Sequence, residues 1–292
     1  MNQLGWIFAV LSAVGFSFKA ILVKLAYRHG VDAETLLALR MSFSLPFFLA
    51  MGWRARNSQA PLAGRDWAVL FGLGFLGYYL ASYLDFLGLR YITAALERLI
   101  LFLYPTLVIV WSAIFLHKPI TRRILLAMGL CYGGIGLAVT HDIQVAGDQG
   151  MVVLGCLLVF GSAVSYALFL MGNGEVVGRL GAARVTAVAS SVACLLSIGQ
   201  FLVLRPVERL MAQPSEVHGL ALAMAVFATV LPVWLLAEAL RRIGAGSVAL
   251  TSNLGPVGTM LLGWLLLGEA ISGSQLLGAA LVIGGVGVMA RR

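Results

Sequence analysis

Residues 150–172, GMVVLGCLLVFGSAVSYALFLMG, form an apolar run of 23 residues without a single charged side chain. A helix that crosses the hydrocarbon core of a bilayer needs about 20 such residues. Strands of a membrane barrel would instead give short segments of alternating polarity. This stretch therefore predicts a membrane-spanning helix, in a protein whose main solvent is lipid.

Nine further stretches have a similar length and character. The weakest of them contains Arg40, which is expected either to reach the interface or to face the bundle interior. The sequence thus predicts an all-α integral membrane protein with ten transmembrane helices, joined by loops too short to hold a soluble domain. The ten predicted spans are 4–26, 34–53, 67–88, 93–116, 121–140, 150–172, 184–204, 217–238, 243–267 and 272–290.

The composition of the whole chain agrees with this fold class. Hydrophobic residues make up 61% and charged residues 11%, against about 25% charged in soluble domains. The net charge of +8 is spread in small groups between apolar runs, unlike the basic stripes of nucleic-acid-binding proteins, so no nucleic-acid partner is expected. The three cysteines are odd in number and include no C-x-x-C pair, which indicates neither a disulfide framework nor a metal site.

The distribution of Lys and Arg predicts the orientation in the membrane. With both termini in the cytoplasm, the inner segments hold twelve Lys and Arg residues and the outer ends hold five. Cytoplasmic loops of membrane proteins are enriched in these residues. We therefore expect a multi-pass protein of the bacterial inner (plasma) membrane, with the N-terminus and C-terminus cytoplasmic.

The chain also repeats itself at a shift of 151 residues. Leu103-x-Pro105 lies on Leu254-x-Pro256, and Gly133-Gly134-x-Gly136 lies on Gly284-Gly285-x-Gly287. The first and sixth spans align more loosely at a shift of 148, which pairs Ser17-Phe18 with Ser165-Tyr166. The predicted halves are residues 1–145 and 146–292. Five helices in each half make the second half enter the membrane upside down.

Inverted repeats are typical of secondary transporters, whose substrate site lies near the midplane where the halves meet. The repeat therefore favours alternating access, with a channel or a structural scaffold as the alternatives. Matched prolines in the fourth and ninth spans predict hinges beside a cavity, at Pro105 and at Gly255-Pro256, because proline removes a helix hydrogen bond. The alternative is that these prolines are merely tolerated. The glycine motifs indicate close helix packing.

Two charged residues within the spans are candidate site residues. Lys19 and Glu97 are possible charge partners, because an ionisable group in a membrane is usually functional. Glu97 either receives a cation or proton, or forms a structural ion pair with Lys19 or Arg90.

Other polar and aromatic residues are candidates for lining a cavity, with simple packing as the alternative. Tyr79, Tyr83, Tyr104, Tyr166 and Trp234, together with Phe18, are predicted to form an aromatic wall, while Ser82, Ser252 and Asn253 are predicted to offer hydrogen bonds.

Catalysis is not expected. All four histidines fall in predicted loops or at helix ends, Asp85 is the one aspartate inside a predicted span, and no H-E-x-x-H motif occurs. The sequence therefore predicts no enzyme, no catalytic residue, no bound metal and no cofactor.

The pattern as a whole resembles a known family. Ala95-Leu96-Glu97-Arg98, Phe102-x-Tyr104-Pro105-Thr106, Phe115-Leu116-His117-Lys118-Pro119 and Leu265-Leu266-Leu267-Gly268-Glu269 are similar to segments of EamA-type transporters of the drug/metabolite transporter superfamily. The resemblance covers the whole chain. Ala13-Val14-Gly15-Phe16 stands where the family usually has a first-helix tryptophan, so that contact is not carried over.

Within the family, the chain most resembles YddG-type amino-acid exporters. The resemblance implies export of a small-molecule substrate, an amino acid with a large apolar or aromatic side chain, by a carrier without a cofactor. A carrier of another metabolite or drug is the alternative. Proton coupling and oligomeric state are left open.

Overall fold

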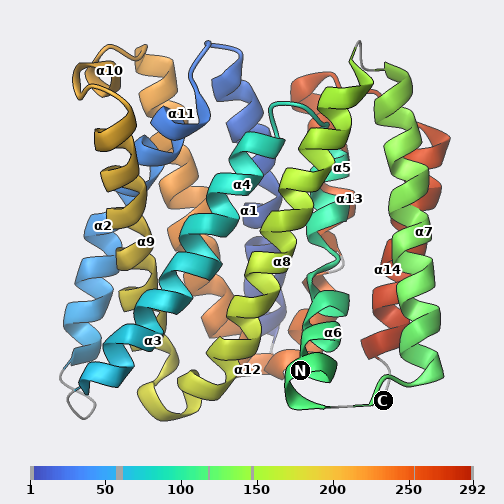
Figure 1. Ribbon diagram of the computed structural model, residues 1–292, viewed down its shortest axis with the longest axis horizontal. Coiled ribbons are helices and arrows are strands. Elements are labelled where there is room, and N and C mark those ends of the chain that lie inside the picture. Colours follow the sequence, from blue (N-terminus) through green and yellow to red (C-terminus); the bar gives the residue numbers. More distant parts are fainter. Residues whose placement is uncertain (1–2, 57–61, 118, 146–147, 253, 291–292) are drawn as a thin grey trace.

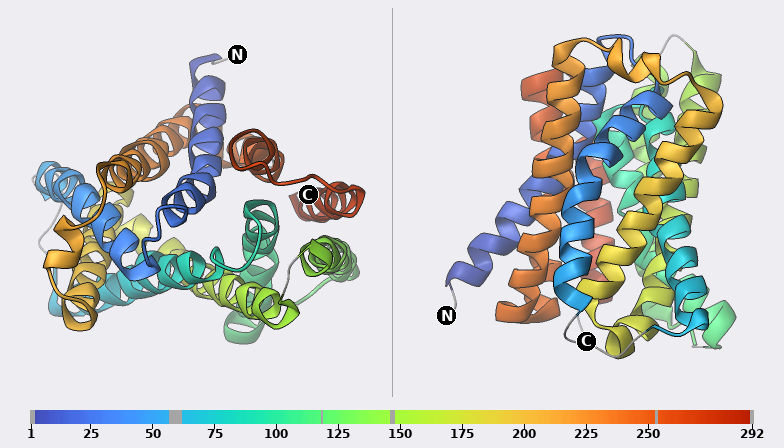
Figure 2. Two further views of the ribbon diagram at one scale, coloured as in Figure 1. Left: turned by 90° about the horizontal axis from the view of Figure 1, so that it is seen from above. Right: turned by 90° about the vertical axis from the view of Figure 1, so that its left-hand side faces the viewer.

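The computed structural model describes residues 3–56, 62–117, 119–145, 148–252 and 254–290. Throughout these ranges the regular elements are helices, which stand side by side as an upright bundle (Figure 1). A helix satisfies its backbone hydrogen bonds internally, as lipid requires. Both chain ends lie at the lower end of the bundle (Figure 1), as the right-hand view of Figure 2 also shows.

The helices of the first half alternate in direction and include one π-helical turn. They are α1 Gln3–Tyr27, α2 Ala33–Arg56, α3 Gly64–Gly74, η1 Phe75–Leu80, α4 Ala81–Gly88, α5 Ala94–Leu101, α6 Tyr104–Leu116 and α7 Arg122–Val145.

The second half has the same plan with an added short helix, α10, at the upper end. Its elements are α8 Gln149–Leu180, α9 Ala182–Leu204, α10 Glu208–Met211, α11 Ser215–Ala225, η2 Val226–Val230, α12 Leu231–Ser252, α13 Leu254–Leu262, η3 Gly263–Leu267 and α14 Gly273–Ala290.

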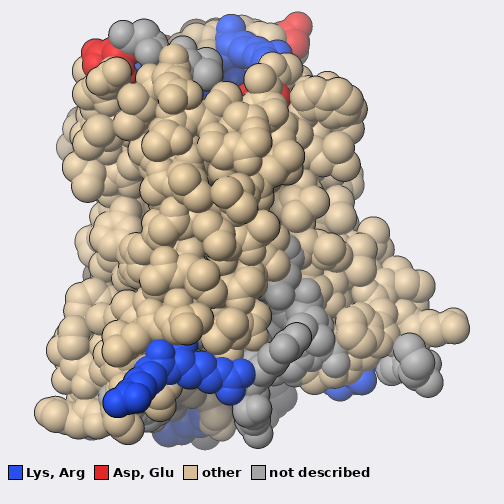
Figure 3. Space-filling model, turned by 90° about the vertical axis from the view of Figure 1, so that its right-hand side faces the viewer, with Lys and Arg blue, Asp and Glu red and all other residues tan. Residues whose placement is uncertain are grey.

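The all-α membrane fold predicted from the sequence is confirmed. In the described part of the chain, eight helical segments are long and apolar enough to cross a bilayer, and two shorter apolar helices cover Leu254–Leu267 and Gly273–Val288. These ten segments fall on the ten predicted spans, although the last two are too short to establish the count of ten. Figure 3 shows the consequence on one face, where charged side chains gather at the two ends and leave an uncharged belt between them.

Two helices run further than predicted. Helix α8 continues to Leu180, beyond the predicted end at 172. Helix α7 continues to Val145, beyond the predicted end at 140, and so brings the buried Asp142 into a helix. Asp142 is tolerated there because Thr93 and Gln275 donate hydrogen bonds to it.

Backbone irregularities recur at the shift of 151 residues. The π-turn η1 starts at Phe75 and its counterpart η2 starts at Val226. The left-handed residues His117 and Gly268 end the fourth and ninth helical segments. These are departures from helical regularity, which chance similarity between apolar helices would not align, so they support the repeat independently of the sequence match.

The two copies are inverted relative to each other. In Figure 1 the chain rises from α3 to α4, whereas the matching segment descends from α11 to α12. Helices of one half pack against the corresponding helices of the other half. Helix α1 packs on α12, and the matching helix α8 packs on α4. Helix α2 packs on its own counterpart α9, and α7 packs on α14. The boundary at 145/146 stays a prediction.

The first and sixth helices correspond at a shift of 150 rather than 148. Ser12 donates to the carbonyl of Pro232 at 2.9 Å, and Ser162 donates to the carbonyl of Ala81 at 2.7 Å. Because Ala81 and Pro232 are themselves 151 apart, the two serines are equivalent. The looser match that placed Ser17 on Ser165 was therefore displaced by two residues.

Candidate functional site

Helix α5 lies inside the bundle, where it contacts α1, α7, α8, α13 and α14. It begins because the Thr93 side chain accepts a hydrogen bond from the backbone N–H of Leu96, at 3.2 Å, as an N-cap. It ends at Leu101, and the chain restarts as α6 at Tyr104 with Pro105 in the first turn. Proline is suited to a first turn and not to a helix interior.

The ninth segment has its matched proline at the corresponding place. Helix α12 is described as far as Ser252 and α13 from Leu254, with Pro256 buried in the first turn of α13. Residue 253 between them lies outside the described residues, so a break in the ninth segment has no structural account. The fourth segment is interrupted before Pro105 as predicted, and the role of both prolines as hinges stays a prediction.

Three charged side chains meet below the upper end of α5. The ammonium Nζ of Lys19 lies 2.7 Å from Oδ2 of Asp85 and 3.1 Å from Oε1 of Glu97. Glu97 is fully buried and the Asp85 side chain is 2% exposed, whereas Lys19 keeps 18% of its side-chain surface accessible. We call Lys19, Asp85 and Glu97 the buried triad. The predicted Lys19–Glu97 partnership is thus present, with Asp85 as a third member.

Arg98, next in sequence to Glu97, points to the other half of the molecule. A Cβ atom added at Gly255 would lie 3.0 Å from an Nη atom of Arg98, so the guanidinium lies against the backbone of α13. Ser17 of α1 donates to the carbonyl of Gly255 at 3.1 Å. The backbone around Gly255 therefore lies between α1 and α5. A side chain at position 255 would press on the guanidinium of Arg98, which would have to shift by a few tenths of an ångström.

Two predicted wall residues lie near Arg98. The rings of Tyr104 and Tyr166 meet edge to face with centroids 5.5 Å apart. The hydroxyl groups of both tyrosines interact electrostatically with the Arg98 guanidinium. Tyr104, Tyr166 and Arg98 are all partly exposed. Arg98 therefore keeps part of its surface accessible although α5 contacts five other helices.

A second group of predicted residues lies on η1 and α4. Tyr79 and Tyr83 stack with parallel rings, 6.4 Å between centroids. Ser82 accepts a hydrogen bond from Arg40 at 3.2 Å, and the Arg40 guanidinium lies 5.0 Å from the ring centroid of Phe86. Arg40 is 5% exposed. It therefore faces the bundle interior, which was one of its two predicted positions.

Phe18 and Trp234 lie apart from these groups. Phe18 lines an apolar groove of about 400 Å³ between α1 and the segment from α11 to α12. Trp234 is 57% exposed and packs against Phe8, with ring centroids 5.8 Å apart. Asn253 and the side chain of Ser252 lie outside the described residues, so their predicted roles have no structural account.

Contacts between the halves close the upper end of the molecule. The carboxylate of Glu269 accepts from the backbone N–H of Ala94 at 3.1 and 3.2 Å and pairs with Lys24 at 3.1 Å. The negative charge also suits the N-terminus of α5. Lys24 and Glu269 line a pocket of about 360 Å³ at this end. Lys24 thus makes a contact between the two halves.

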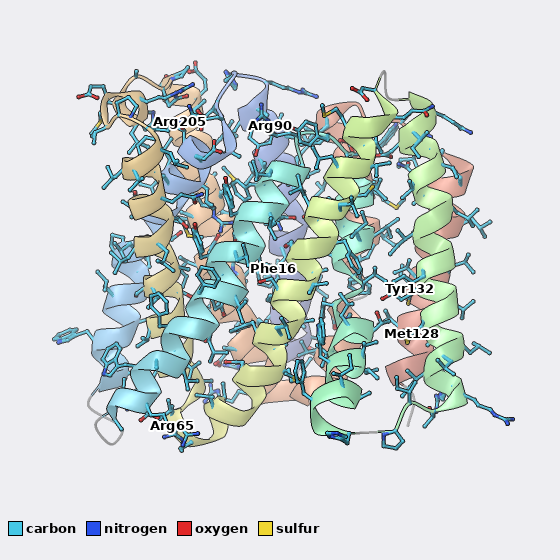
Figure 4. All side chains as sticks on the ribbon, in the orientation of Figure 1. Phe16, Arg65, Arg90, Met128, Tyr132 and Arg205 are labelled. Atoms are coloured by element: carbon cyan, nitrogen blue, oxygen red, sulfur yellow. The ribbon has the colours of Figure 1, made fainter. Side chains whose placement is uncertain are left out.

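A second pair of contacts joins the halves at the same end. Arg209 lies 3.3 Å from Asp32, and Arg205 lies 3.8 Å from Glu34. Burial alone would raise the pKa of the Asp32 carboxyl, but hydrogen bonds from Thr35 hold that pKa below its usual range. Asp32 therefore stays a carboxylate facing Arg209. Figure 4 places Arg90 and Arg205 at this upper end and Arg65 at the lower end.

Sequence reasoning missed two members of the site. Asp85 was noted as an aspartate within a span but was not assigned to Lys19, which is 66 residues away. Arg98 was seen only as the neighbour of Glu97. A usable signal existed for both, since each is an ionisable group in an apolar segment.

Comparisons with known proteins agree with the fold. The sequence profile of the EamA-like transporter family matches residues 3–140 and 153–291. The "Uncharacterized transporter YcbK" of Bacillus subtilis (strain 168) is 30% identical over 94% of this chain and 88% of its own length. The "Uncharacterized transporter YyaM" of the same organism is 29% identical over 73% of this chain and 70% of its own length. A solved crystal structure with 20% identity superposes over 99% of each chain with a TM-score of 0.64.

Proposed function

Because the chain belongs to the EamA-like transporter family, we propose that it is a secondary carrier that exports small organic metabolites by alternating access. Its proposed substrates are amino acids with large apolar or aromatic side chains. The observation that carries the proposal is the position of Arg98, a partly exposed cation between Gly255 of α13 and the Tyr104–Tyr166 pair.

The proposed binding mode follows from that position. The guanidinium of Arg98 binds the substrate carboxylate, for which its planar donor geometry is suited. Tyr104 and Tyr166 provide an aromatic surface for the side chain, because aromatic rings attract one another edge to face. Tyr79, Tyr83, Phe18 and Trp234 remain predicted wall residues, and Ser82, Ser252 and Asn253 remain predicted polar contacts.

The inverted repeat supports alternating access. Two similar halves can exchange conformations, which opens one central site to each side in turn. The contacts of Glu269 and Lys24 keep the upper end closed in this structure. Carriers of another metabolite or drug, channels and scaffolds are the rival functions.

Uptake by liposomes that contain the purified protein tests the proposal across an amino-acid panel. We expect saturable uptake that is accelerated by substrate on the opposite side, strongest for phenylalanine and similar side chains. A channel would not show this acceleration and a scaffold would give no flux. Absence of transport for every amino acid by well-folded protein would reject the substrate class.

Truncation of an aromatic ring tests the wall. Tyr166→Ala is expected to weaken transport of phenylalanine more than that of alanine, by about 1–3 kcal/mol for the lost buried contact. Tyr132→Ala is the matched control, since Tyr132 is 39% exposed on α7. Equal losses for both amino acids would indicate general damage and remove Tyr166 from the site.

The proposed hinges have their own expected result. Replacing Pro105 or Pro256 with alanine restores a backbone N–H donor at that position. We expect substrate exchange to become slower while the substrate concentration that gives half-maximal transport changes less, because the proline belongs to the proposed moving element. Unchanged exchange rates in both variants would assign the prolines a packing role.

We also propose that the lower end, where both termini lie, faces the cytoplasm of a bacterial inner membrane. The basic residues of the sequence are concentrated on this side. A reporter enzyme that works only in the cytoplasm is expected to be active when it is fused after Arg292. Activity only for a periplasmic reporter would reverse the assignment of both ends.

A further inference from the structure

The buried triad contains more carboxylate oxygens than it has donors. Oδ1 of Asp85 and both Oε atoms of Glu97 are buried and accept no hydrogen bond from the described residues. Lys19 is the cation in direct contact with both carboxyl groups. Leaving buried polar atoms without donors is costly, and more so for a charged group.

Asp142 shows what a purely structural buried carboxylate looks like in this protein. Its two oxygens accept hydrogen bonds from the N–H and hydroxyl of Thr93, at 2.8 and 3.0 Å, and from Gln275 at 3.1 Å. Neither oxygen of this carboxyl group is left without a donor. The triad has the opposite arrangement, with two carboxyl groups sharing one cation.

We propose that Asp85 and Glu97 form a binding site for one exchangeable proton, which the ammonium group of the substrate displaces during transport. The proton forms an O–H bond on one carboxylate, and that O–H donates to the other. Binding removes one buried negative charge and supplies the missing donor. When the substrate ammonium arrives, the O–H bond breaks and the proton leaves to water, so that one positive charge replaces another.

The remaining charged and titratable groups around the pair are engaged elsewhere. Tyr27 of α1 donates to the carbonyl of Phe86 at 2.6 Å. Arg40 of α2 contacts Ser82 and the ring of Phe86. Arg98 of α5 lies against Gly255. These groups act on the pair only through space and leave its oxygens for a proton.

The location of the triad suits coupling. Glu97 lies three residues beyond Ala94, about 4.5 Å along the helix from the N–H that Glu269 accepts. The triad is therefore directly beneath the closed upper end, and the exposed part of Lys19 gives it a contact with accessible space. The competition with substrate rests on the proposed function, whereas the proton site itself does not.

Infrared difference spectroscopy of the purified protein in liposomes, titrated without substrate between about pH 5 and pH 9, tests the proton site directly. We expect a protonated-carboxyl band equivalent to one group per protein that disappears as pH rises. Glu97→Gln and Asp85→Asn should each abolish it. Asp142→Asn is the control and should leave the band unchanged.

The outcomes separate the two proposals. A titrating band lost in both triad variants supports the proton site even if no amino acid is transported. A missing band, or a band that survives in both variants, overturns the site whatever the transport result. With a transported amino acid in hand, Glu97→Gln should abolish pH-driven accumulation and Asp142→Asn should retain it, whereas accumulation by Glu97→Gln equal to that of the unmodified protein would overturn the coupling.

Discussion

Gly134→Ala is expected to destabilise the protein by about 1–3 kcal/mol, the usual effect of forcing an extra methyl group into a packed contact. A Cβ atom at Gly134 would lie 2.5 Å from the carbonyl oxygen of Gly278, and a Cβ atom at Gly278 would clash equally with the carbonyl of Gly134. The backbones of α7 and α14 touch at this point. Backbone cannot move aside as the end of a flexible side chain can.

The neighbouring glycine provides the control. A Cβ atom at Gly133 meets nothing within 4 Å, so Gly133→Ala should be neutral or slightly stabilising, since alanine favours helix by about 1 kcal/mol over glycine. Thermal unfolding of the detergent-solubilised variants measures the difference. Equal midpoints for both variants would contradict the close contact between α7 and α14.

Glu269→Ala is expected to open the upper end of the molecule. The substitution removes the cap on the Ala94 N–H and the partly buried pair with Lys24, which together contribute about 1–2 kcal/mol to the closed state. The closed-to-open ratio should therefore fall roughly 5- to 30-fold. The sequence position that matches Glu269 in the first half is Lys118, whose side chain has no oxygen to accept an N–H.

Paired spin labels at Arg90 and Ala270, both exposed at the upper end, measure this change as a distance distribution, after the three cysteines are replaced by alanine. In Glu269→Ala, a larger fraction of the molecules should show the longer distance between the two spin labels. Glu238→Ala is the control, because Glu238 pairs with Arg241 and Arg242 of its own helix. An unchanged distribution in Glu269→Ala would show that other contacts hold the upper end closed.

Much of the fold could be predicted because its signals are local. Apolar length predicts a spanning helix, and the matched prolines predicted the interruption of the fourth segment that is now seen before Tyr104. Predicted ends were less accurate, as for α7, where Asp142 is accommodated by donors on other elements. The mean hydropathy of a sequence window does not show which donors on other elements will contact a residue.

The candidate site was predictable in its residue types but not in its pairings. Glu97 and Lys19 were found because charge stands out against an apolar background. Trp234 was predicted to belong to the same aromatic wall as Tyr83, yet it packs against Phe8. The repeat relates positions in two copies and says nothing about which helices meet.

The amino-acid sequence by itself determined that this chain is helical and resides in lipid, that its two halves share one plan, and where the fourth segment is interrupted. These properties follow from backbone hydrogen bonding and apolar length, which act within a single segment. Only the tertiary structure decided that Lys19 meets Asp85, that Arg98 reaches Gly255, and that Gly134 rather than Gly133 contacts α14. Lipid and the bundle interior are both apolar, so hydropathy does not reveal the rotation of a helix about its axis, and its packing partners decide which side chains meet.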